Sequence, residues 1–412
     1  RGVIMKAKNY NLNDTKLDDS KVFRDAVHNY IHVDQPVILD LINSKEMQRL
    51  RRIKQLGGTH LVYQSAEHSR FCHCLGVYFI VRKMIFNSEV GKYLSDYDKL
   101  TVMCAALLHD LGHGPFSHCF EGAFGLNHEE YTVKIINGNS DVNCILESFE
   151  KGFSKKVSSI IEKTHPNTIL IQMISSQLDA DRMDYLLRDS YFTGTTYGHF
   201  DLYRILRVMK VVDNKIVYKY SGVQAIENYI LARYHMYWQV YYHPTSRSYE
   251  QLLISIFRRM KDLYNEGYDF GDIRYLTPFL DGNVNEVDYV KLDESIVLYY
   301  FRLLSESNDK ILADLCDRFL NRKLFAYRDL NNEEEKIKII NEFAKSETAV
   351  RYYVVSDDQS QIPYLYYDNN EVNAIEILVN HELKLLPEVS EIVGAITNSS
   401  KNKIDHKIFY PE

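Results

Sequence analysis

Apolar residues recur at helical spacing along most of residues 68–264, and this periodicity constrains the fold more than any other feature of the chain. An apolar residue at every third or fourth position places all of them on one face of a helix. Only eight prolines and 18 glycines occur in 412 residues, which favours long helices over strands and turns. We therefore expect a mainly α fold, with helices at 68–86, 97–109, 127–137, 155–164, 168–175, 179–189, 223–242 and 246–264.

Short β-hairpins are expected at two places. Residues 22–33 alternate loosely between apolar and polar side chains, and residues 208–220 form two alternating runs on either side of Asp213-Asn214, a pair that favours a tight turn. After the first hairpin, residues 42–56 predict a helix that ends at Gly57-Gly58.

From about residue 270 the pattern changes to loops, helices and strands in mixed order. We expect helices near 293–306, 309–320 and 333–345, and strands within 351–358 and 362–368. A single hydrophobic core seldom grows beyond ~250–300 residues, so the chain is long enough for a second unit. The expected organisation is an N-terminal extension (1–20), a helical core (21–268) and a smaller C-terminal α+β lobe (269–412).

Composition is that of an ordinary soluble globular protein, and it narrows the range of partners. Hydrophobic residues make up 45% of the chain, charged residues make up 25%, and the net charge is -7. A net negative charge argues against a nucleic-acid partner, which requires clustered Lys and Arg. The sequence has no apolar leader and no apolar span of ~20 residues, so we expect no membrane partner and a cytoplasmic location. The six cysteines form no CxxC pair and are expected to be reduced thiols.

Three of the fifteen histidines lie within LLHDLGHGPFSH, residues 107–118, directly after an apolar helix. Gly112 and Gly114 permit the turn that ends this helix, so His109 and Asp110 are expected at its buried end. Buried polar groups destabilise a fold unless they are hydrogen-bonded or bound to a metal. Several imidazoles beside one carboxylate therefore favour a functional site over ordinary core histidines.

Two further segments, 67–77 and 176–189, carry histidine, arginine, aspartate and tyrosine side chains at helical spacing. A solvated, charge-paired helix face would show the same spacing in the second segment. Nitrogen and carboxylate donors without thiolate suit a divalent ion such as Mn²⁺, Fe²⁺, Zn²⁺ or Mg²⁺. The residues concerned are His68, Arg70, His73, Asp181, Arg182, Tyr185, Arg188 and Asp189.

Four motifs resemble a known family in their order and spacing. They are RFCHCLGV at 70–77, LLHDLGHGPFSH at 107–118, NHEE at 127–130 and DADRMDYLLRD at 179–189. Together they resemble the HD-domain phosphohydrolases and, within these, the deoxynucleoside triphosphate (dNTP) triphosphohydrolases, especially bacterial dNTPases that share their core with the SAM-and-HD-domain enzyme. The resemblance runs from about Val22 to Tyr242, includes KQLGG at 54–58, and implies an HD-domain helical core.

The resemblance implies a divalent metal ion and a hydrolytic reaction. Family members hydrolyse dNTPs at the α-phosphorus and release deoxynucleoside and intact triphosphate. The positions that match the family's metal ligands are His73, His109, Asp110 and Asp181, although Asp110 read alone would also fit as a capping residue. The positions that contact the α-phosphate or move protons are His113, His118 and His128. Imidazole suits proton transfer because its unperturbed pKa is ~6.5. His128 also fits as an ordinary helix N-terminal residue after Asn127.

Substrate contacts are also implied by position. Arg70, Arg182 and Arg233 match triphosphate contacts, and without the family match each would be read as a surface ion-pair partner. The sugar is expected to contact Gln55, Tyr185 and Asp189, with Leu56 and Tyr241 as wall positions. Steric exclusion of a 2′-hydroxyl is the expected basis for the choice of deoxyribose.

A regulatory nucleotide site is a weaker implication. Gln48 and Arg51 match positions that contact an activator guanine in relatives, but the expected acidic partner is Asn43, which cannot accept two hydrogen bonds as a carboxylate does. Lys21 and Arg204 would supply cationic character, or would be exposed charges at an oligomer face. The metal motif also departs from the family, because Cys72 stands where a glutamate is usual. The implied partners are a dNTP substrate, a dNTP or GTP activator, and further copies of the chain in a homotetramer.

Two alternatives remain open on the sequence alone. One is an HD phosphohydrolase that acts on a nucleoside monophosphate, an alarmone or a cyclic dinucleotide. The other is a non-catalytic nucleotide-sensing scaffold whose metal site is vestigial.

Overall fold

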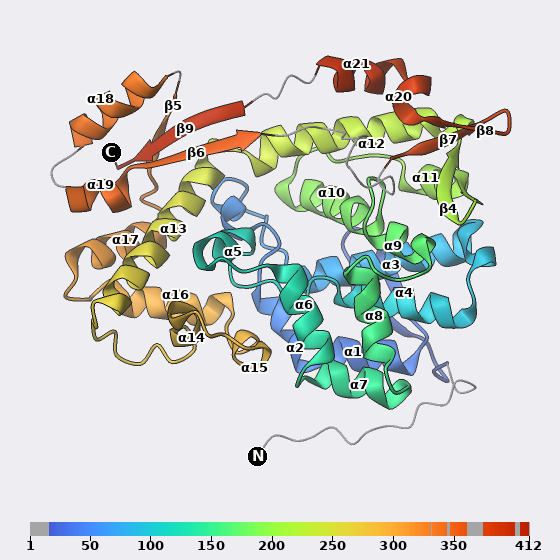
Figure 1. The fold of residues 1–412 in the computed structure, drawn as a ribbon, viewed down its shortest axis with the longest axis horizontal. Coiled ribbons are helices and arrows are strands. Elements are labelled where there is room, and N and C mark those ends of the chain that lie inside the picture. Colours follow the sequence, from blue (N-terminus) through green and yellow to red (C-terminus); the bar gives the residue numbers. More distant parts are fainter. Residues whose placement is uncertain (1–15, 331, 344–346, 361–373, 400–403, 412) are drawn as a thin grey trace.

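The computed structural model describes residues 16–330, 332–343, 347–360, 374–399 and 404–411, and within these it is mainly helical, as the sequence predicts (Figure 1). Its centre is formed by α3 (Arg70–Asn87), α4 (Asp96–Leu108) and α10 (Ala180–Thr193), and α3 contacts both of the others. α3 and α4 bury residues on nearly all sides, and helices of this kind are stable only when other elements cover them. Three of the four motifs therefore lie in or directly beside the centre of the fold, and the fourth, at 127–130, lies at a surrounding helix.

The helices that surround this centre follow the predicted segments closely. They are α6 (His128–Asn137), α8 (Phe153–Ile161), α9 (Thr168–Ile174), α12 (Val223–Met236) and α13 (Pro244–Asn265). α12 continues into a π-helical stretch, η5 (Tyr237–Tyr241), before α13 begins. Three short helices have no predicted counterpart, because seven to nine residues show too little apolar periodicity: α5 (His118–Phe124), α7 (Asp141–Phe149) and α11 (Leu202–Val208).

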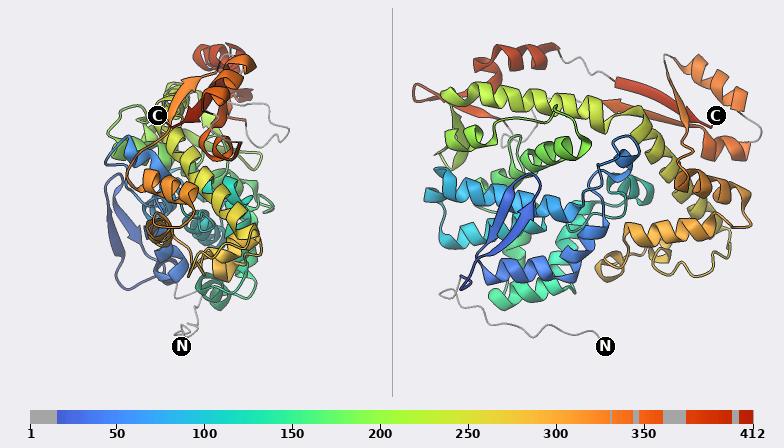
Figure 2. Two further views of the ribbon diagram at one scale, coloured as in Figure 1. Left: turned by 90° about the vertical axis from the view of Figure 1, so that its left-hand side faces the viewer. Right: turned by 180° about the vertical axis from the view of Figure 1, so that it is seen from behind.

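Both predicted hairpins are confirmed. β1 (Lys21–Asp25) pairs with β2 (Asn29–Val33), and β3 (Met209–Val212) pairs with β4 (Lys215–Lys219), each antiparallel. Asp213 and Asn214 occupy the second turn with φ of 50° and 60°, a conformation that Asp and Asn tolerate. The first hairpin lies across the helices on the side that faces away from the viewer in Figure 1, and β2 contacts α3 (Figure 2).

The single helix predicted over residues 42–56 is wrong. The structure has α1 (Pro36–Asn43), α2 (Lys45–Arg49) and a 3₁₀ turn, η1 (Leu50–Arg52). Ser44 separates α1 from α2, because its Oγ accepts a hydrogen bond from N of Met47 and caps the second helix. After η1 the chain is extended, and Lys54 pairs with Ser69 as an isolated β-bridge. A second 3₁₀ turn, η2 (Gly57–Leu61), follows.

The C-terminal part of the chain contains helices and strands, as expected. The helices are α14 (Thr277–Asp281), α15 (Glu286–Tyr289), α16 (Glu294–Leu304), α17 (Lys310–Leu320), α18 (Glu333–Phe343), α19 (Glu347–Tyr353), α20 (Leu386–Val389) and α21 (Glu391–Ser399). The strand expected over 351–358 is only partly correct, because α19 extends to Tyr353 and β6 (Val355–Ser360) begins after it. The strand expected within 362–368 lies outside the described residues.

The C-terminal strands divide between two sheets. β5 (Ala326–Asp329), β9 (Ile404–Tyr410) and β6 form an antiparallel sheet in the order β5-β9-β6. β7 (Glu376–Val379) and β8 (Glu382–Leu385) instead extend the β3-β4 hairpin, with β7 parallel to β4. One large hydrophobic cluster joins buried residues from α3 to α21, including Phe301, Phe319 and Val393. The domain boundary at residue 268 therefore stays a prediction, since the chain returns to the core after it. None of the helices in the described ranges has the length and apolar content needed to cross a membrane.

Candidate metal centre and adjoining pocket

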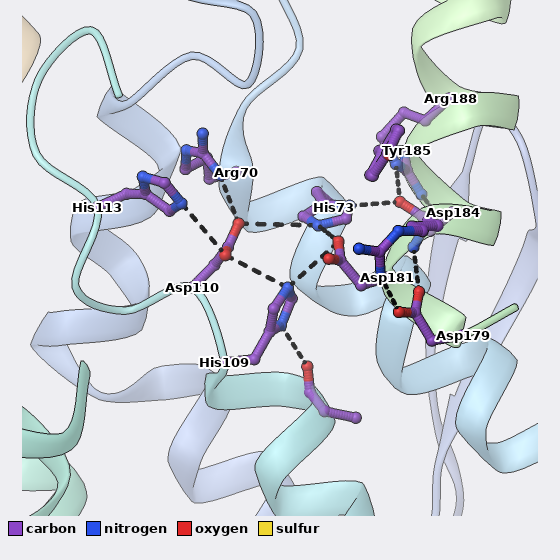
Figure 3. Close-up of polar contacts among 12 residues, drawn as sticks. Arg70, His73, His109, Asp110, His113, Asp179, Asp181, Asp184, Tyr185 and Arg188 are labelled. Carbon is purple, nitrogen blue, oxygen red and sulfur yellow. Dashed lines mark hydrogen bonds and ion pairs between the residues drawn. The ribbon is translucent and has the colours of Figure 1, made fainter. Parts of the chain in front are cut away.

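Three central helices bring the four predicted metal ligands together (Figure 3). His73 comes from α3, His109 and Asp110 follow the end of α4, and Asp181 lies in the first turn of α10. Nε2 of His73 lies 3.0 Å from Oδ1 of Asp181 and 3.7 Å from Oδ2 of Asp110. Nε2 of His109 lies 3.3 Å from Oδ1 of Asp110 and 3.6 Å from Oδ1 of Asp181. His73, His109 and Asp181 thus share one centre, and Asp110 lies beside it with one oxygen facing each imidazole.

Both imidazoles turn Nε2 toward these carboxylates. His73 uses Nδ1–H to donate to Oδ2 of Asp184 at 2.8 Å, and His109 uses Nδ1–H to donate to the carbonyl oxygen of Ala106 at 3.0 Å. In the neutral tautomer each Nε2 is then an acceptor, and among the described residues neither buried Nε2 has a partner in hydrogen-bond geometry. Lone pairs of nitrogen and carboxylate oxygen that face each other repel unless a proton or a metal ion lies between them. Two nitrogens and two carboxylates therefore fit a divalent ion.

The carboxylates of this centre stay ionised, and their negative charge favours the binding of a cation. Burial raises the pKa of Asp181, but the neighbouring imidazoles of His109 and His73 outweigh burial and hold this pKa well below its usual range. The same holds for Asp110, where burial is opposed by His109, His113 and Arg70. Burial lowers the pKa of His73, but Asp181 and its partner Asp184 outweigh burial and raise the pKa to about 10, so without an ion Nε2 carries a proton that a bound cation would replace. The carboxylates create the negative potential that a bound cation requires.

A buried network behind His73 was not predicted. Both oxygens of Asp184 accept hydrogen bonds: Oδ2 from His73 and from Nε of Arg188, Oδ1 from Nε2 of His28 at 2.6 Å and from Nη2 of Arg188 at 3.0 Å. Nη1 of Arg188 in turn donates to Asp25 at 2.9 Å. A Cβ at Gly76 would lie 1.8 Å from Oδ1 of Asp184, so only glycine leaves room for this carboxylate. Hydrogen-bonded carboxylates behind a ligating histidine fix its tautomer and raise its basicity.

The three predicted proton-transfer histidines also lie together, around a carboxylate that was not predicted. Oε1 of Glu121 lies 3.0 Å from Nδ1 of His113 and 3.5 Å from Nδ1 of His118. Its Oε2 accepts a hydrogen bond from Nδ1–H of His128 at 2.9 Å. The rings of His113 and His128 stack with centroids 3.9 Å apart. Burial and the neighbouring Arg70 lower the pKa of His113 to about 4, so its imidazole is neutral near pH 7.

The loop between α4 and α5 holds strained backbone beside this cluster. Phe116 and Ser117 have φ of 60° and 55°, which non-glycine residues rarely adopt. Oγ of Ser117 accepts a hydrogen bond from Nε of Arg70 at 2.9 Å, while Nη1 of Arg70 donates to Oδ2 of Asp110 at 2.5 Å. Glu294 of α16 also supports the loop, because its Oε1 accepts hydrogen bonds from N of Phe116 and N of Lys54. Strain at a site of this kind persists only when neighbouring contacts impose it.

One cavity of about 490 Å³ joins the metal centre to these elements. Its volume is within the ~300–1,000 Å³ of typical small-molecule sites. Tyr237, Tyr242, Arg247 and Glu250 line it in addition to predicted residues. Most of the predicted site residues are in its wall: Gln55, Leu56, Arg70, Asp110, His113, His118, His128, Asp181, Tyr185, Asp189 and Tyr241.

Polar groups in one part of the wall are well suited to a hydroxyl ligand. Oε1 of Gln55 is buried and, among the described residues, has no hydrogen-bond partner. Asp189 accepts from Nε2 of His68 at 2.7 Å and from the hydroxyl of Tyr241 at 2.8 Å, which holds that tyrosine against the cavity. The Tyr185 and Tyr241 rings meet edge to face at 6.1 Å.

The remaining predicted substrate arginines do not line this cavity. Arg182 is paired with Asp179, and its Nη1 donates to the carbonyl oxygen of Ser176 at 2.6 Å. Nη1 of Arg233 donates to Oε1 of Gln177 at 2.8 Å. Their predicted role in holding a triphosphate would require these contacts to be exchanged for phosphate oxygens.

The predicted regulatory residues are at or near the surface. Lys21 and Asn43 are exposed, Nε of Arg51 donates to Oε1 of Gln48 at 2.9 Å, and Nη2 of Arg204 donates to the carbonyl oxygen of Ser221 at 2.6 Å. Their regulatory role stays a prediction.

Comparison with known proteins agrees with this geometry. The family model described as the HD domain matches residues 70–189, and one described as an HD associated region matches residues 200–277. The chain is 48% identical over 407 residues to the uncharacterized protein YwfO of Bacillus subtilis, a match that covers 96% of this chain and 93% of that protein. The chain belongs to the HD-domain phosphohydrolase family.

Two further relatives of this HD-domain protein are informative. A solved phosphohydrolase from Bacteroides thetaiotaomicron superposes with a TM-score of 0.84 at 29% identity, over 96% of this chain and 100% of that one. The deoxynucleoside triphosphate triphosphohydrolase SAMHD1 of Homo sapiens is 27% identical over 441 residues, which covers 96% of this chain and 66% of that protein.

The missed residues that support the site hold predicted residues or their loops in place rather than carrying a family motif themselves. Glu121 and Asp184 follow a predicted residue by three positions, at His118 and Asp181, so helical spacing could have indicated them. His28 and Glu294 come from distant segments and carry no sequence signal for the site.

Proposed function

We propose that this HD-domain phosphohydrolase hydrolyses dNTPs to deoxynucleoside and inorganic triphosphate. The observation that carries the proposal is a single cavity whose wall combines Asp110 and Asp181 of the metal centre, the three histidines around Glu121, and the unpartnered amide oxygen of Gln55. A nucleoside triphosphate needs a cation for its phosphates, a proton source for its leaving oxygen and a partner for its sugar hydroxyl. The likeness to SAMHD1, whose name states this activity, supports the same substrate class.

In this proposal the divalent ion is held by His73, His109, Asp110 and Asp181. When bound, the ion would neutralise charge at the α-phosphate and acidify a water molecule. Arg70, held in place by Asp110 and Ser117, supplies a further positive charge at the cavity wall. Its fork of donors suits phosphate oxygens.

Proton transfer is assigned to the histidines around Glu121. The His118 side chain is 74% exposed and lines the cavity, so it can reach the departing 5′ oxygen of a bound nucleotide. Glu121 and the stacked rings of His113 and His128 orient it. A positioned imidazole contributes ~10²–10⁴-fold to such a step.

Selectivity for deoxyribose is assigned to the opposite part of the wall. Gln55 accepts the hydrogen of the 3′-hydroxyl, and Tyr185 with Tyr241 leaves no room for a 2′-hydroxyl. Support comes from the free amide oxygen of Gln55 and from the hydrogen bond that fixes Tyr241 on Asp189. The full proposal includes a homotetramer and activation by a dNTP or GTP at a site formed by Lys21, Asn43, Gln48, Arg51 and Arg204.

The test is product analysis with each of the four dNTPs in Mn²⁺, with and without GTP. Deoxynucleoside and triphosphate are expected, and loss of turnover is expected for Asp110→Ala. Monophosphate and pyrophosphate as products would refute the reaction. Turnover confined to a monophosphate, an alarmone or a cyclic dinucleotide would favour another HD phosphohydrolase, and retained metal without any turnover would favour a sensing scaffold.

A further inference from the structure

The histidines around Glu121 form a donor set separate from the metal centre. We call His113, His118, Glu121 and His128 the imidazole cluster. Each of these residues offers a ligand atom, and these atoms all lie within 4.8 Å of one another. The three histidines line the cavity, and none of the four residues belongs to the centre of His73, His109 and Asp181.

Two atoms of this cluster lack the partners that a purely hydrogen-bonded arrangement would give them. Nδ1 of His113 and Oε1 of Glu121 are buried and, in the part of the chain that is described, neither has a partner in hydrogen-bond geometry, although they lie 3.0 Å apart. The His113 side chain is only 2% exposed and that of Glu121 12% exposed, so water does not readily replace the missing partners. A cation between the two atoms would satisfy both.

We propose that the imidazole cluster is a second metal site, that it takes Zn²⁺ in preference to Mn²⁺ or Mg²⁺, and that the bound ion inhibits the hydrolase. A tetrahedral Zn²⁺ with bonds of ~2.0–2.2 Å keeps its ligand atoms roughly 3.3–3.5 Å apart. Oε1 of Glu121 already lies 3.0 Å and 3.5 Å from Nδ1 of His113 and of His118. His128, whose Nδ1 donates to Oε2 of Glu121, exchanges this proton for the ion.

The fold holds these donors in place before an ion arrives. His118 and Glu121 are three residues apart on α5 and share a face. His128 is the first residue of α6, and N of Gly112 donates to Oγ1 of Thr132 on the same helix at 2.8 Å. A Cβ at Gly112 would lie 2.1 Å from the carbonyl oxygen of His128, so this glycine allows the loop of His113 to approach α6. The ion therefore needs small side-chain adjustments only.

The donor types explain the expected preference for zinc. Three imidazoles and one carboxylate form a nitrogen-rich set, whereas Mg²⁺ prefers oxygen ligands and Mn²⁺ binds such sites more weakly than Zn²⁺. The N-terminus of α6 opposes a cation, but Glu129 and Glu130 in its first turn offset this effect. The guanidinium of Arg70 lies nearby, but its positive charge is offset because it is paired with Asp110.

Inhibition is the part of this inference that rests on the proposed function. An imidazole whose nitrogen binds Zn²⁺ cannot donate or accept a proton at that atom. The same three histidines are assigned to proton transfer, so a filled imidazole cluster removes the proton source. Binding itself does not depend on which nucleotide is hydrolysed.

Equilibrium dialysis of the chelator-treated protein against Zn²⁺, followed by metal counting, tests the site. Two zinc ions per chain are expected for the wild type, one for Glu121→Gln and one for Asp181→Asn. Glu333→Gln is the matched control, because this carboxylate is 74% exposed on α18, outside the imidazole cluster, and should leave the count at two. His128→Asn serves as a second variant of the cluster if Glu121→Gln does not fold. One zinc in the wild type, or two in both cluster variants, would overturn the proposal.

Zinc titration of the Mn²⁺-loaded enzyme separates the two proposals. Loss of dNTP turnover at the zinc level that fills the second site is expected. Full turnover with two metals bound would overturn the inhibitory role. An enzyme that hydrolyses no dNTP under any condition would overturn the proposed function, while the zinc count would still decide the imidazole cluster.

Discussion

Replacement of Asp184 by asparagine is expected to weaken metal binding at the His73 centre about 10–100-fold. Asp184 is fully buried and accepts hydrogen bonds from His28, His73 and Arg188. An amide offers one acceptor oxygen and turns two N–H donors toward groups that are themselves donors. His73 would lose the charged partner that fixes Nδ1–H, so its Nε2 lone pair would be presented less often and would be less basic.

Asp184→Asn should change both the free energy of metal binding and the free energy of unfolding. A 10–100-fold loss corresponds to about 1.4–2.7 kcal/mol of binding free energy. Folding should also weaken, because removing one partner of a buried ion pair costs roughly 3–5 kcal/mol. The cost in Asp184→Asn is expected near the lower end, since Arg188 keeps its contact with Asp25 at 2.9 Å.

The assay is competition for Mn²⁺ between the protein and a chelator of known affinity, with thermal melting recorded in parallel. Asp34→Asn is the matched control: it breaks the Asp34–Arg82 ion pair, whose arginine is also on α3, but Asp34 has no contact with His73 in the described structure. The control should melt earlier and bind metal as the wild type does. A folded Asp184→Asn protein with wild-type affinity would refute the idea that this carboxylate prepares His73 for an ion.

Three further predictions concern the pocket and its supports. Gln55→Ala should raise the KM for dNTPs about 5–30-fold with little change in kcat, because it removes one hydrogen bond to a bound hydroxyl, worth about 1–2 kcal/mol; an unchanged KM would remove Gln55 from the sugar site. Burial raises the pKa of Glu294 to about 7 from 4.5, so the folded state binds this proton more tightly than the unfolded state does. Stability should therefore fall by up to about 3 kcal/mol as pH rises from about 4.5 through 7, and Glu294→Gln should flatten this part of the profile in melts at several pH values. Gly112→Ala should cost about 1–3 kcal/mol of stability through its contact with α6, whereas Gly122→Ala, which meets no atom within 4 Å, should be neutral or slightly stabilising in denaturant titrations.

Helical periodicity predicted the long elements well, because burial of an apolar face determines where such helices form. The ends of α4 illustrate this: Ser95 and Asp98 form a capping box at its start, and the loop of Gly112 follows its end. Periodicity failed over 42–56, where Ser44 offers the backbone a competing cap and the following residues are extended. The pairing of β4 with β7 could not be predicted, because the paired residues Tyr218 and Ile377 lie far apart in the chain and no local pattern records such a contact.

The candidate site was predictable to the extent that its residues belong to the four motifs. Motif residues such as His73 and Asp181 carry a family pattern, and the structure brings them within 3.0 Å of each other. The residues that support these motif residues have no such pattern. His28, for example, reaches Asp184 from a hairpin 156 positions away in the chain. Long-range contacts of this kind depend on packing, which a single sequence does not display.

Asp110 lies between the metal centre and the imidazole cluster. Its Oδ1 lies 3.3 Å from Nε2 of His109 in the metal centre and 3.4 Å from Nε2 of His113 in the imidazole cluster. A charge placed on either side of this carboxylate therefore acts on the other within a few ångströms, at a buried position where solvent screens little. Asp110 also accepts from Arg70, so a change at one cluster reaches the cavity wall as well as the neighbouring cluster. Zinc at the imidazole cluster should accordingly weaken Mn²⁺ at His73, and competition titrations that show independent binding of the two ions would contradict this coupling.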